Sequence, residues 1–158
     1  MERRIVAAAQ ARPGAVPRGG AWQNRGVPAG SEREKRPAAP SISVVICAYT
    51  VKRLGEIERA IKSLEAQTLG AEEILLVIDH APELETICRG RWAGVKVSAN
   101  AEQQGLSGAR NSGLAQSRGE VVAFLDDDAR AAPDWLERLA RAYGDPRVLG
   151  AGGAVRPA

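Results

Sequence analysis

The sequence predicts an α/β fold with a mostly parallel sheet and helices on both of its faces. Three observations support this prediction. Strand-like and helix-like segments alternate four times after residue 41, the strand-like segments are nearly continuous apolar runs, and polar or acidic residues directly follow three of these runs. Continuous apolar runs are typical of strands buried on both faces. Alternating strands and helices are typical of a three-layer α/β/α domain similar to a Rossmann fold.

The first half of the pattern contains two strands and two helices. Residues 42–48 form a β-branched run that predicts the first strand, and residues 73–79 predict the second. Between them, apolar residues recur at steps of three and four, which predicts a helix over 54–68 with Gly70 at its exit. Residues 82–91 predict a weaker helix that starts at Pro82 and directs Leu84, Ile87 and Cys88 inward.

The second half repeats this order. Residues 95–99 alternate and predict the third strand, and residues 121–125 predict the fourth. Ser107 is a candidate cap for a helix that runs to Ser117, with Gly119 as its stop. Pro133 suits the first turn of a last helix, which Gly144 would end. Residues 148–155 indicate one more strand. The core face of the last helix is predicted to consist of Trp135, Leu136, Leu139, Ala140 and Tyr143.

The positive charge of the chain is concentrated at one end. The chain has 158 residues and a net charge of +3, but residues 1–40 alone carry +5 and residues 41–158 carry −2. A nucleic-acid-binding domain would carry its basic patch on the fold itself, so no nucleic-acid partner is expected. Residues 1–40 contain five Pro and five Gly and almost no periodic apolar pattern, and we expect a disordered leader there.

Cysteine usage and hydropathy favour a cytosolic protein. Cys47 and Cys88 lie far apart and form no Cys-x-x-Cys motif, so we expect two reduced, buried thiols. No apolar run reaches the ~18 residues of a membrane-spanning helix. The apolar run that follows the basic start of the chain is also too short for an export signal.

Three consecutive carboxylates give the strongest chemical signal. Asp126, Asp127 and Asp128 directly follow the fourth strand, and ligands of such sheets bind beyond the carboxyl ends of the strands. In an extended backbone Asp126 and Asp128 would point to one side and Asp127 to the other. Two oxygen donors on one side suit Mg²⁺ or Mn²⁺. The alternative interpretation is a solvated acidic loop.

The glycine-rich segment 105–113 gives a second signal. Glycines at a helix start allow close approach of an anion to free backbone amides, and Arg110 would add a positive fork for phosphate or a base edge. The alternative is tight packing of the helix on the sheet. Asp79 either accepts a hydrogen bond from a nucleobase or sugar, or caps the helix at Pro82. Tyr49 either stacks on a base or covers the sheet edge, and His80 is assigned no catalytic role.

With these residues in place, the chain resembles the family 2 glycosyltransferases of the GT-A fold. The resemblance runs from residue 41 to about residue 155. Residues 43–50 are similar to the first strand and Tyr of the family, although Cys47, Ala48 and Thr50 replace its usual Pro, Thr and Asn. Residues 105–113 are similar to its Gly-x-Ser-x-Ala-Arg-Asn-x-Gly element. Residues 124–128, followed by 133–136, are similar to its D-x-D motif and the helix after it.

The resemblance implies a nucleotide-diphosphate sugar as donor, with UDP-sugars expected, and a divalent metal, Mn²⁺ or Mg²⁺. By position, Asp128 would ligate the metal with Asp126, and Asp126 and Asp127 would hold metal-bound water or the donor ribose. Asp79 would lie near the base, and Arg110 near the base or diphosphate. Tyr49 would pack on the base, next to Ala48. Residues 79–82 depart from the Asp-Asp-Gly-Ser that the family often has, so donor preference stays open at that strand end.

The resemblance also implies an inverting transfer to an acceptor hydroxyl, which needs a general base. Family members supply that base after the D-x-D motif, so it is expected beyond Ala158. We therefore interpret residues 41–158 as the N-terminal part of such a domain, truncated after the D-x-D region and inactive on its own. The acceptor could be a glycan, a lipid-linked molecule or a small molecule. A cytoplasmic location is expected, with attachment to the inner face of a membrane through the missing part as an open alternative.

Three other functional classes are alternatives. A non-catalytic nucleotide-binding or interaction domain would bind the same ligand without transfer. A nucleotidyltransferase would carry a glycine-rich basic loop after the first strand, whereas residues 48–53 lack glycine. A response-regulator domain would carry acidic residues at the end of the first strand, and none stands there.

Overall fold

A computed structural model describes residues 4–6, 39–145 and 147–153 of the chain. Their strands form one parallel sheet in the order β1-β5-β2-β3-β4. The strands are β1 (Arg4–Val6), β2 (Ile42–Ala48), β3 (Glu73–Ile78), β4 (Val95–Ala99) and β5 (Val121–Asp126). The predicted α/β class is confirmed, because the apolar runs at β2, β3 and β5 are the central strands of this sheet.

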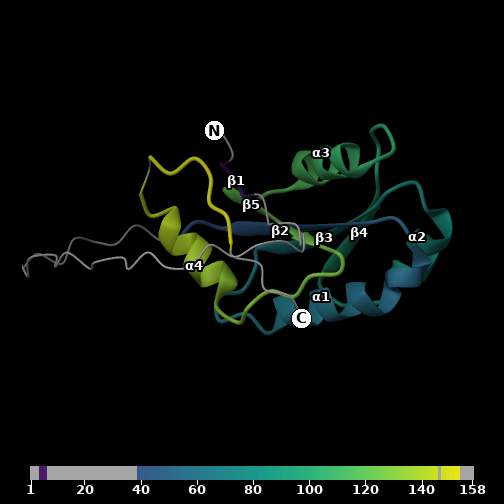
Figure 1. The fold of residues 1–158 in the computed structure, drawn as a ribbon, viewed down its shortest axis with the longest axis horizontal. Helices are drawn as coiled ribbons and strands as arrows, with labels where there is room; N and C mark the ends of the chain where they lie inside the picture. Colours follow the sequence, from purple (N-terminus) through teal and green to yellow (C-terminus); the bar gives the residue numbers. More distant parts are fainter. Residues whose placement is uncertain (1–3, 7–38, 146, 154–158) are drawn as a thin grey trace, which may run out of the picture.

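Helices cover both faces of the sheet (Figure 1). The helix α3 (Leu106–Gln116) lies on one face, and α1 (Leu54–Glu65), α2 (Pro82–Cys88) and α4 (Trp135–Ala142) lie on the other. A short 3-10 helix, η1 (Val51–Arg53), joins β2 to α1. The alternating side chains of the central strands divide between two cores: Val44 and Ile46 face α1, α2 and α4, while Val45 packs with Ala109 of α3.

Glycine makes the close packing of α3 on the sheet possible. A Cβ placed on Gly113 would lie 2.4 Å from the Val45 methyl carbon Cγ1, so only glycine allows the helix backbone to lie this close to β2. Gly119 is also closely surrounded, since its Cβ would lie 2.5 Å from the Ser43 backbone nitrogen. These contacts support the packing interpretation of part of the glycine-rich segment.

Several predicted element ends differ from the structure. The first helix ends at Glu65 rather than at Thr68, and α2 ends at Cys88 because Gly90 takes a positive φ of 70°. The helix α3 ends at Gln116 with Ser117 as its C-cap, so Gly119 is not the helix stop. The last helix begins at Trp135 with Asp134 as its N-cap residue, which leaves Pro133 in the preceding turn.

Two predictions at the chain ends need correction. Residues 4–6 form the edge strand β1 beside β5, so the expected disorder does not apply to them; residues 1–3 and 7–38 lie outside the described residues. The expected strand over 148–155 is wrong for 148–153, which form no strand, and 154–155 lie outside the described part. Among the described residues, no helix has the length and hydropathy needed to cross a lipid bilayer.

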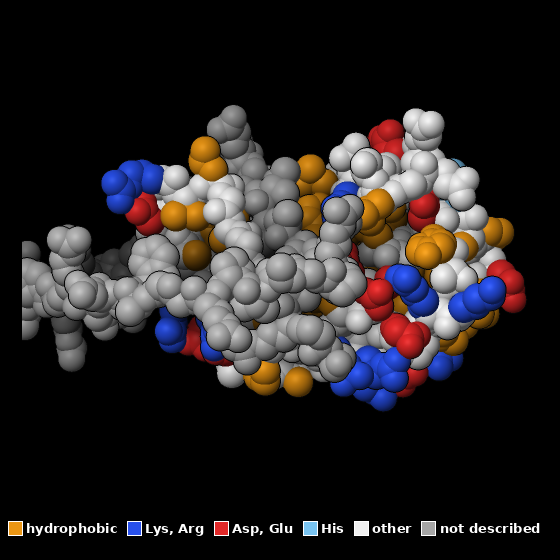
Figure 2. All heavy atoms as spheres, in the orientation of Figure 1, with side chains coloured by type: hydrophobic (Ala, Val, Ile, Leu, Met, Phe, Trp, Pro, Cys, Tyr) orange, Lys and Arg blue, Asp and Glu red, His pale blue; other side chains and the backbone are white. Residues whose placement is uncertain are grey.

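The charged surface carries both signs close together (Figure 2). Several of these charges form ion pairs along one helix, such as Arg138 with Asp134 and Arg141 with Glu137 on α4. Each such exposed pair contributes little to stability. The charges that bear on function lie instead at the carboxyl edge of the sheet.

Candidate functional site

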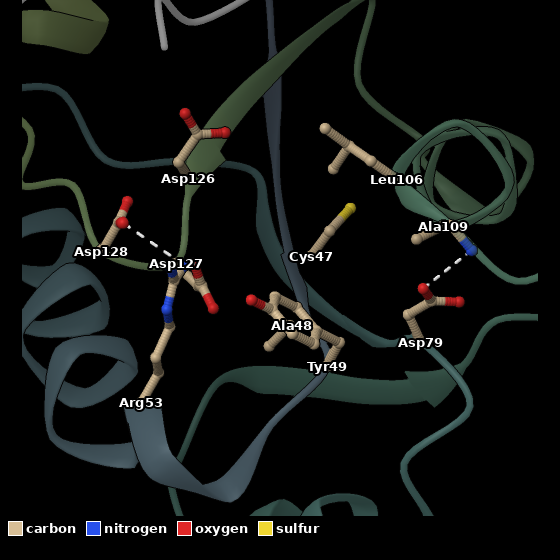
Figure 3. A pocket seen from close by; sticks show the side chains of 11 residues that line it. Cys47, Ala48, Tyr49, Arg53, Asp79, Leu106, Ala109, Asp126, Asp127 and Asp128 are labelled. Atoms are coloured by element: carbon tan, nitrogen blue, oxygen red, sulfur yellow. Dashed lines mark hydrogen bonds and ion pairs between the residues drawn. The ribbon is translucent and has the colours of Figure 1, made fainter. Parts of the chain in front are cut away.

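A cavity of about 510 Å³ opens at the carboxyl ends of the strands (Figure 3). It lies where β2, β3 and β5 end and where α3 begins. The parallel arrangement brings these four chain segments to one edge of the sheet. The residues that line it are Cys47, Ala48, Tyr49, Arg53, Asp79, Gly105, Leu106, Ala109, Asp126, Asp127 and Asp128.

The three consecutive aspartates line the cavity, but their side chains are not arranged as in a strand. The strand β5 ends at Asp126, whose carbonyl accepts a hydrogen bond of 3.0 Å from the Ala129 backbone N–H. This bond closes a tight turn over residues 126–129, which we call the acidic turn. Asp126 pairs with Arg110, whereas Asp127 and Asp128 both pair with Arg53. The expectation that Asp126 and Asp128 share one side is therefore wrong, because it assumed an extended backbone that ends at Asp126.

Two arginines offset part of the negative charge of the acidic turn. The Arg53 guanidinium nitrogen Nη1 lies 2.8 Å from Asp127 Oδ1 and 3.3 Å from Asp128 Oδ2. Arg110 approaches Asp126 Oδ1 at 3.4 Å and lies 5.5 Å from the centre of the Phe124 ring. Arg110 is not among the residues that line the cavity, and it is linked to the cavity wall through Asp126. Its predicted position near the phosphate or base stays a prediction.

Asp127 has an unused charged oxygen. Its side chain is only 6% exposed, and its Oδ2 atom is buried without a hydrogen-bond partner. A buried charged oxygen without a partner is costly and points to a ligand or a solvent molecule that completes its bonding. Burial raises the pKa values of both Asp127 and Asp126 despite their arginine partners. Keeping these two carboxylates charged is therefore electrostatically costly, and a cation placed beside them would lower that cost.

The acidic turn fits a divalent cation through its donor atoms. Asp128 is half exposed, so its carboxylate offers a hard oxygen donor to a cation at the edge of the cavity, while Asp127 Oδ2 is buried without a protein partner next to it. Within the described ranges, no cluster of three or more His, Cys, Asp or Glu side chains is placed to enclose a metal ion. A cation here would consequently need oxygen ligands from water or from a bound anion as well.

Asp79 is fixed by a hydrogen-bond network behind the cavity. Its Oδ1 accepts from the Asn100 side-chain amide at 2.7 Å, and its Oδ2 accepts from the Gly105 backbone N–H at 2.9 Å. The alternative that Asp79 caps the helix at Pro82 is wrong, because the N-cap residue of α2 is Ala81 and no side chain caps it. Asp79 instead anchors the entry to α3, with one edge of its carboxylate lining the cavity.

The glycine-rich segment begins α3 in a conformation that only glycine adopts readily. Gly105 is the N-cap residue and has a φ of 126°. A Cβ on Gly108 would lie 2.0 Å from the Gln103 carbonyl oxygen, so this position also excludes a side chain. The prediction that Ser107 caps the helix is wrong: Ser107 lies inside α3, and the cap makes no side-chain hydrogen bond.

Ala48 is the last residue of β2 and Tyr49 directly follows it, as the sequence predicts. Tyr49 is 57% exposed, and its ring lies 5.6 Å from the Arg53 guanidinium carbon, while Ala48 is buried in the cavity floor. Cys47 also lines the cavity, and burial raises the pKa of its thiol to about 12. This half-buried thiol is neutral at physiological pH and presents a small, weakly polar wall.

Sequence reasoning assigned no site role to Arg53 or Asn100 at this edge, and it described His80 as a residue without a catalytic role. Arg53 reaches the acidic turn across 74 positions of the chain, and Asn100 reaches Asp79 across 21. His80 has a φ of 50°, and its Nε2 lies 3.0 Å from the Glu102 carbonyl oxygen, so it contacts the loop before α3. The sequence feature that could have indicated Arg53 is its position shortly after the buried strand β2, at the end of η1, which brings it to the carboxyl edge of the sheet.

The cavity lies at the carboxyl edge of a parallel sheet, with an acidic turn on one wall and a glycine-bounded helix start on the other, which is where α/β proteins of this architecture commonly bind polar ligands. The family described as Glycosyl transferase family 2 matches residues 43–157. The chain belongs to this family.

Relatives and solved structures support this membership. A glucosyl-dolichyl phosphate glucuronosyltransferase of Haloferax volcanii is 35% identical over 120 residues, which cover 73% of this chain and 38% of that protein. S. aureus TarS 1-349 in complex with UDP-GlcNAc superposes with a TM-score of 0.52 and 26% identity, over 64% of this chain and 30% of that one.

A third match shows the fold alone. The mannosyltransferase PcManGT of Pyrobaculum calidifontis, solved in complex with GDP-Man and Mn²⁺, has a TM-score of 0.56 and 24% identity, over 69% of this chain and 34% of that one. The GT-A resemblance is thereby confirmed at the level of fold and family. The chain spans about a third of the length of the curated relatives that it matches.

Proposed function

We propose that residues 41–158 form the N-terminal, donor-binding part of a glycosyltransferase domain that uses a nucleotide-diphosphate sugar, with UDP-sugars as the favoured donors. The observation that carries this proposal is the convergence of Tyr49, Asp79 and the acidic turn on one cavity, with Arg110 paired to Asp126 of that turn. The match of residues 43–157 to glycosyl transferase family 2 supports the same reaction class.

The cavity offers complementary groups for each part of such a donor. The exposed Tyr49 ring offers an apolar face for a nucleobase. Asp79 still has carboxylate lone pairs available beyond its two hydrogen bonds and accepts from a base or sugar N–H or O–H. Arg110 supplies a cation for the diphosphate or the base edge. The complex of TarS with UDP-GlcNAc supports a uridine donor.

We assign the divalent cation, Mn²⁺ or Mg²⁺, to the acidic turn. Asp128 is the exposed direct ligand, Asp126 is the second expected ligand, and Asp127 holds water or ribose near them. Bound there, the cation would stabilise the negative charge that builds on the diphosphate as the sugar leaves. The buried Asp127 Oδ2 without a partner supports a cation at this place, and the structure of PcManGT with GDP-Man and Mn²⁺ is a precedent on the same fold.

Transfer by this proposal is a single displacement with inversion. The acceptor hydroxyl would lose its proton to a general base outside the donor cavity, and the sequence expectation for that base is a position beyond Ala158. Asp79 and the acidic turn then act on the donor alone, by orienting the nucleotide and balancing the charge of the leaving diphosphate.

We also propose a cytoplasmic location. Cys47 and Cys88 are both free, and burial raises the pKa values of both thiols. Cys88 is buried as expected, whereas Cys47 is only half-buried, and free thiols of both kinds are typical of proteins in a reducing compartment.

Titration calorimetry of the chain with UDP in the presence of Mn²⁺ tests the donor site. Binding is expected with Mn²⁺ and is expected to weaken at least tenfold, about 1.4 kcal/mol, in EDTA and in the variant Asp128→Asn. The matched control is Asp134→Asn, which removes an exposed carboxylate that pairs with Arg138 outside the cavity. Absence of UDP binding by a folded chain with Mn²⁺, or equal binding by the two variants, would overturn the proposal.

A further inference from the structure

Arg53 makes two contacts that place it at the centre of the acidic wall of the cavity. Its guanidinium pairs with Asp127 at 2.8 Å and with Asp128 at 3.3 Å (Figure 3). The same guanidinium lies over the Tyr49 ring, 5.6 Å from its centre. One cation therefore contacts both the acidic turn and the aromatic ring on which a nucleobase would pack.

The negative charge of the acidic turn is sufficient to balance either Arg53 or a divalent cation, but not both at once. Three carboxylates, Asp126, Asp127 and Asp128, face the two guanidiniums of Arg53 and Arg110, which leaves one net negative charge. A divalent cation added to this set would produce a net positive charge at the turn. If the Arg53 side chain leaves, the three carboxylates balance the divalent cation and Arg110. Like charges at ion-pair distances repel strongly where water is partly excluded.

The Arg53 side chain is also accessible enough to move away from the acidic turn. Its side chain is 38% exposed, in contrast to the 6% of its partner Asp127. Arg53 is the last residue of η1 and the N-cap residue of α1, and its side chain makes no capping hydrogen bond that would hold it there. An arginine guanidinium is always charged at neutral pH, so Arg53 carries its charge in either position.

We propose that Arg53 is a built-in counter-cation that pairs with Asp127 and Asp128 in the metal-free protein and competes with the divalent cation for the acidic turn, Asp128 being the ligand that both would use. Arg53 is then a positioning residue: it keeps the acidic turn and Tyr49 in place while the cavity is empty, and it releases both when the cation binds. This inference rests on the proposed function, which puts the cation at the acidic turn.

The test measures the affinity of the chain for Mn²⁺ alone, by the loss of the free-ion signal in electron paramagnetic resonance, for wild type, Arg53→Gln and Arg53→Lys. We expect Arg53→Gln to bind Mn²⁺ about tenfold more tightly than wild type and to unfold at a lower temperature in EDTA. Arg53→Lys keeps the charge and is expected to stay close to wild type in both measurements. The matched control is Arg59→Gln, which breaks an exposed pair with Glu56 on α1 and is expected to change neither.

The direction of the change decides the result. A merely structural arginine would give weaker Mn²⁺ binding on removal, because the acidic turn would lose its arrangement. Unchanged or weaker binding by Arg53→Gln would overturn the competition, while the proposed function would stand if wild type still binds UDP with Mn²⁺. Failure of every variant to bind Mn²⁺, with or without UDP, would refute the proposed function and this inference together.

Discussion

Asn100 donates a 2.7 Å hydrogen bond from its side-chain amide to the Asp79 carboxylate, which ties together the residues that directly follow the neighbouring strands β4 and β3. Asn100 is 6% exposed and uses both ends of its amide: the same NH₂ reaches the Gln103 carbonyl, and its oxygen accepts from the Ser112 hydroxyl and the Glu102 N–H. One side chain thus connects the sheet edge, the loop before α3 and α3 itself.

Replacement of Asn100 by Ala is therefore expected to destabilise the fold and to weaken UDP binding. Its removal leaves Asp79 Oδ1 without its donor and the Ser112 O–H without its acceptor, which costs about 1–3 kcal/mol. Urea denaturation measures this loss. Asn111→Ala is the matched control, because Asn111 is exposed on α3 and its change is expected to stay within about 0.5 kcal/mol. Equal effects of the two variants would show that the network does not stabilise the site.

Two glycine-to-alanine substitutions give a second prediction, because they are expected to change the stability of the fold in opposite directions. Gly113→Ala is expected to destabilise by about 1–3 kcal/mol, because the new methyl group would lie 2.4 Å from Val45 Cγ1 and push α3 off the sheet. Gly55→Ala is expected to stabilise by about 0.5–1 kcal/mol, because Gly55 lies in α1 with open space around its Cβ position. Thermal unfolding of the two variants distinguishes these outcomes, and a stable Gly113→Ala protein would contradict the packing described for α3.

The buried carboxylates of the acidic turn give a prediction on pH. Burial raises the pKa of Asp127 above its ordinary value of 3.8. A carboxyl with a raised pKa contributes stability below its unfolded pKa, and that contribution is lost as the pH rises through the folded pKa. At neutral pH in EDTA, Asp127→Asn is therefore expected to unfold at a higher temperature than wild type, and the difference should shrink as the pH falls toward 3.8.

Glu73 provides the control for this experiment, because its pKa is shifted in the opposite direction to that of Asp127. Burial alone would raise its pKa, but hydrogen bonds from the Arg118 N–H and the Ser43 hydroxyl, together with the Arg118 charge, lower it. Its stabilisation is present above its ordinary pKa of 4.5 and is lost as the pH falls through the lowered value. Glu73→Gln should thus lower the unfolding temperature at neutral pH. A lower unfolding temperature of Asp127→Asn under the same conditions would contradict the electrostatic cost assigned to the acidic turn.

Thiol reactivity tests the description of Cys47. Although Cys47 lines the cavity, burial raises the pKa of its thiol to about 12, so almost no thiolate is present at pH 8. Alkylation by iodoacetamide, followed by mass spectrometry, is expected to be slow for Cys47 and for the buried Cys88 in the native chain. Both should react quickly in urea. Rapid native labelling at Cys47 would show a more open or more positive cavity than described.

Local patterns sufficed for the central strands and most helices, because β2, β3 and β5 are buried on both faces and their apolar runs show it directly. Tyr49, Asp79 and Asp126 could be placed at one edge because parallel strands end together. β1 could not be predicted, since three residues near the start of the chain gain strand structure only from β5. Arg53 and Asn100 escaped prediction because their partners are distant in sequence, and the acidic turn was mispredicted because strand geometry was extended past Asp126.

The register between β2 and β5 has an evolutionary consequence. Cys47 pairs with Asp126 in the last rung of that ladder, and each added or lost residue in β5 would shift the aspartates by about 3.3 Å and reverse their facing. Insertions and deletions should consequently be rejected inside these two strands and tolerated at the opposite rim of the sheet, in the largely exposed connection 66–72. An alignment of related chains should show its gaps at that rim.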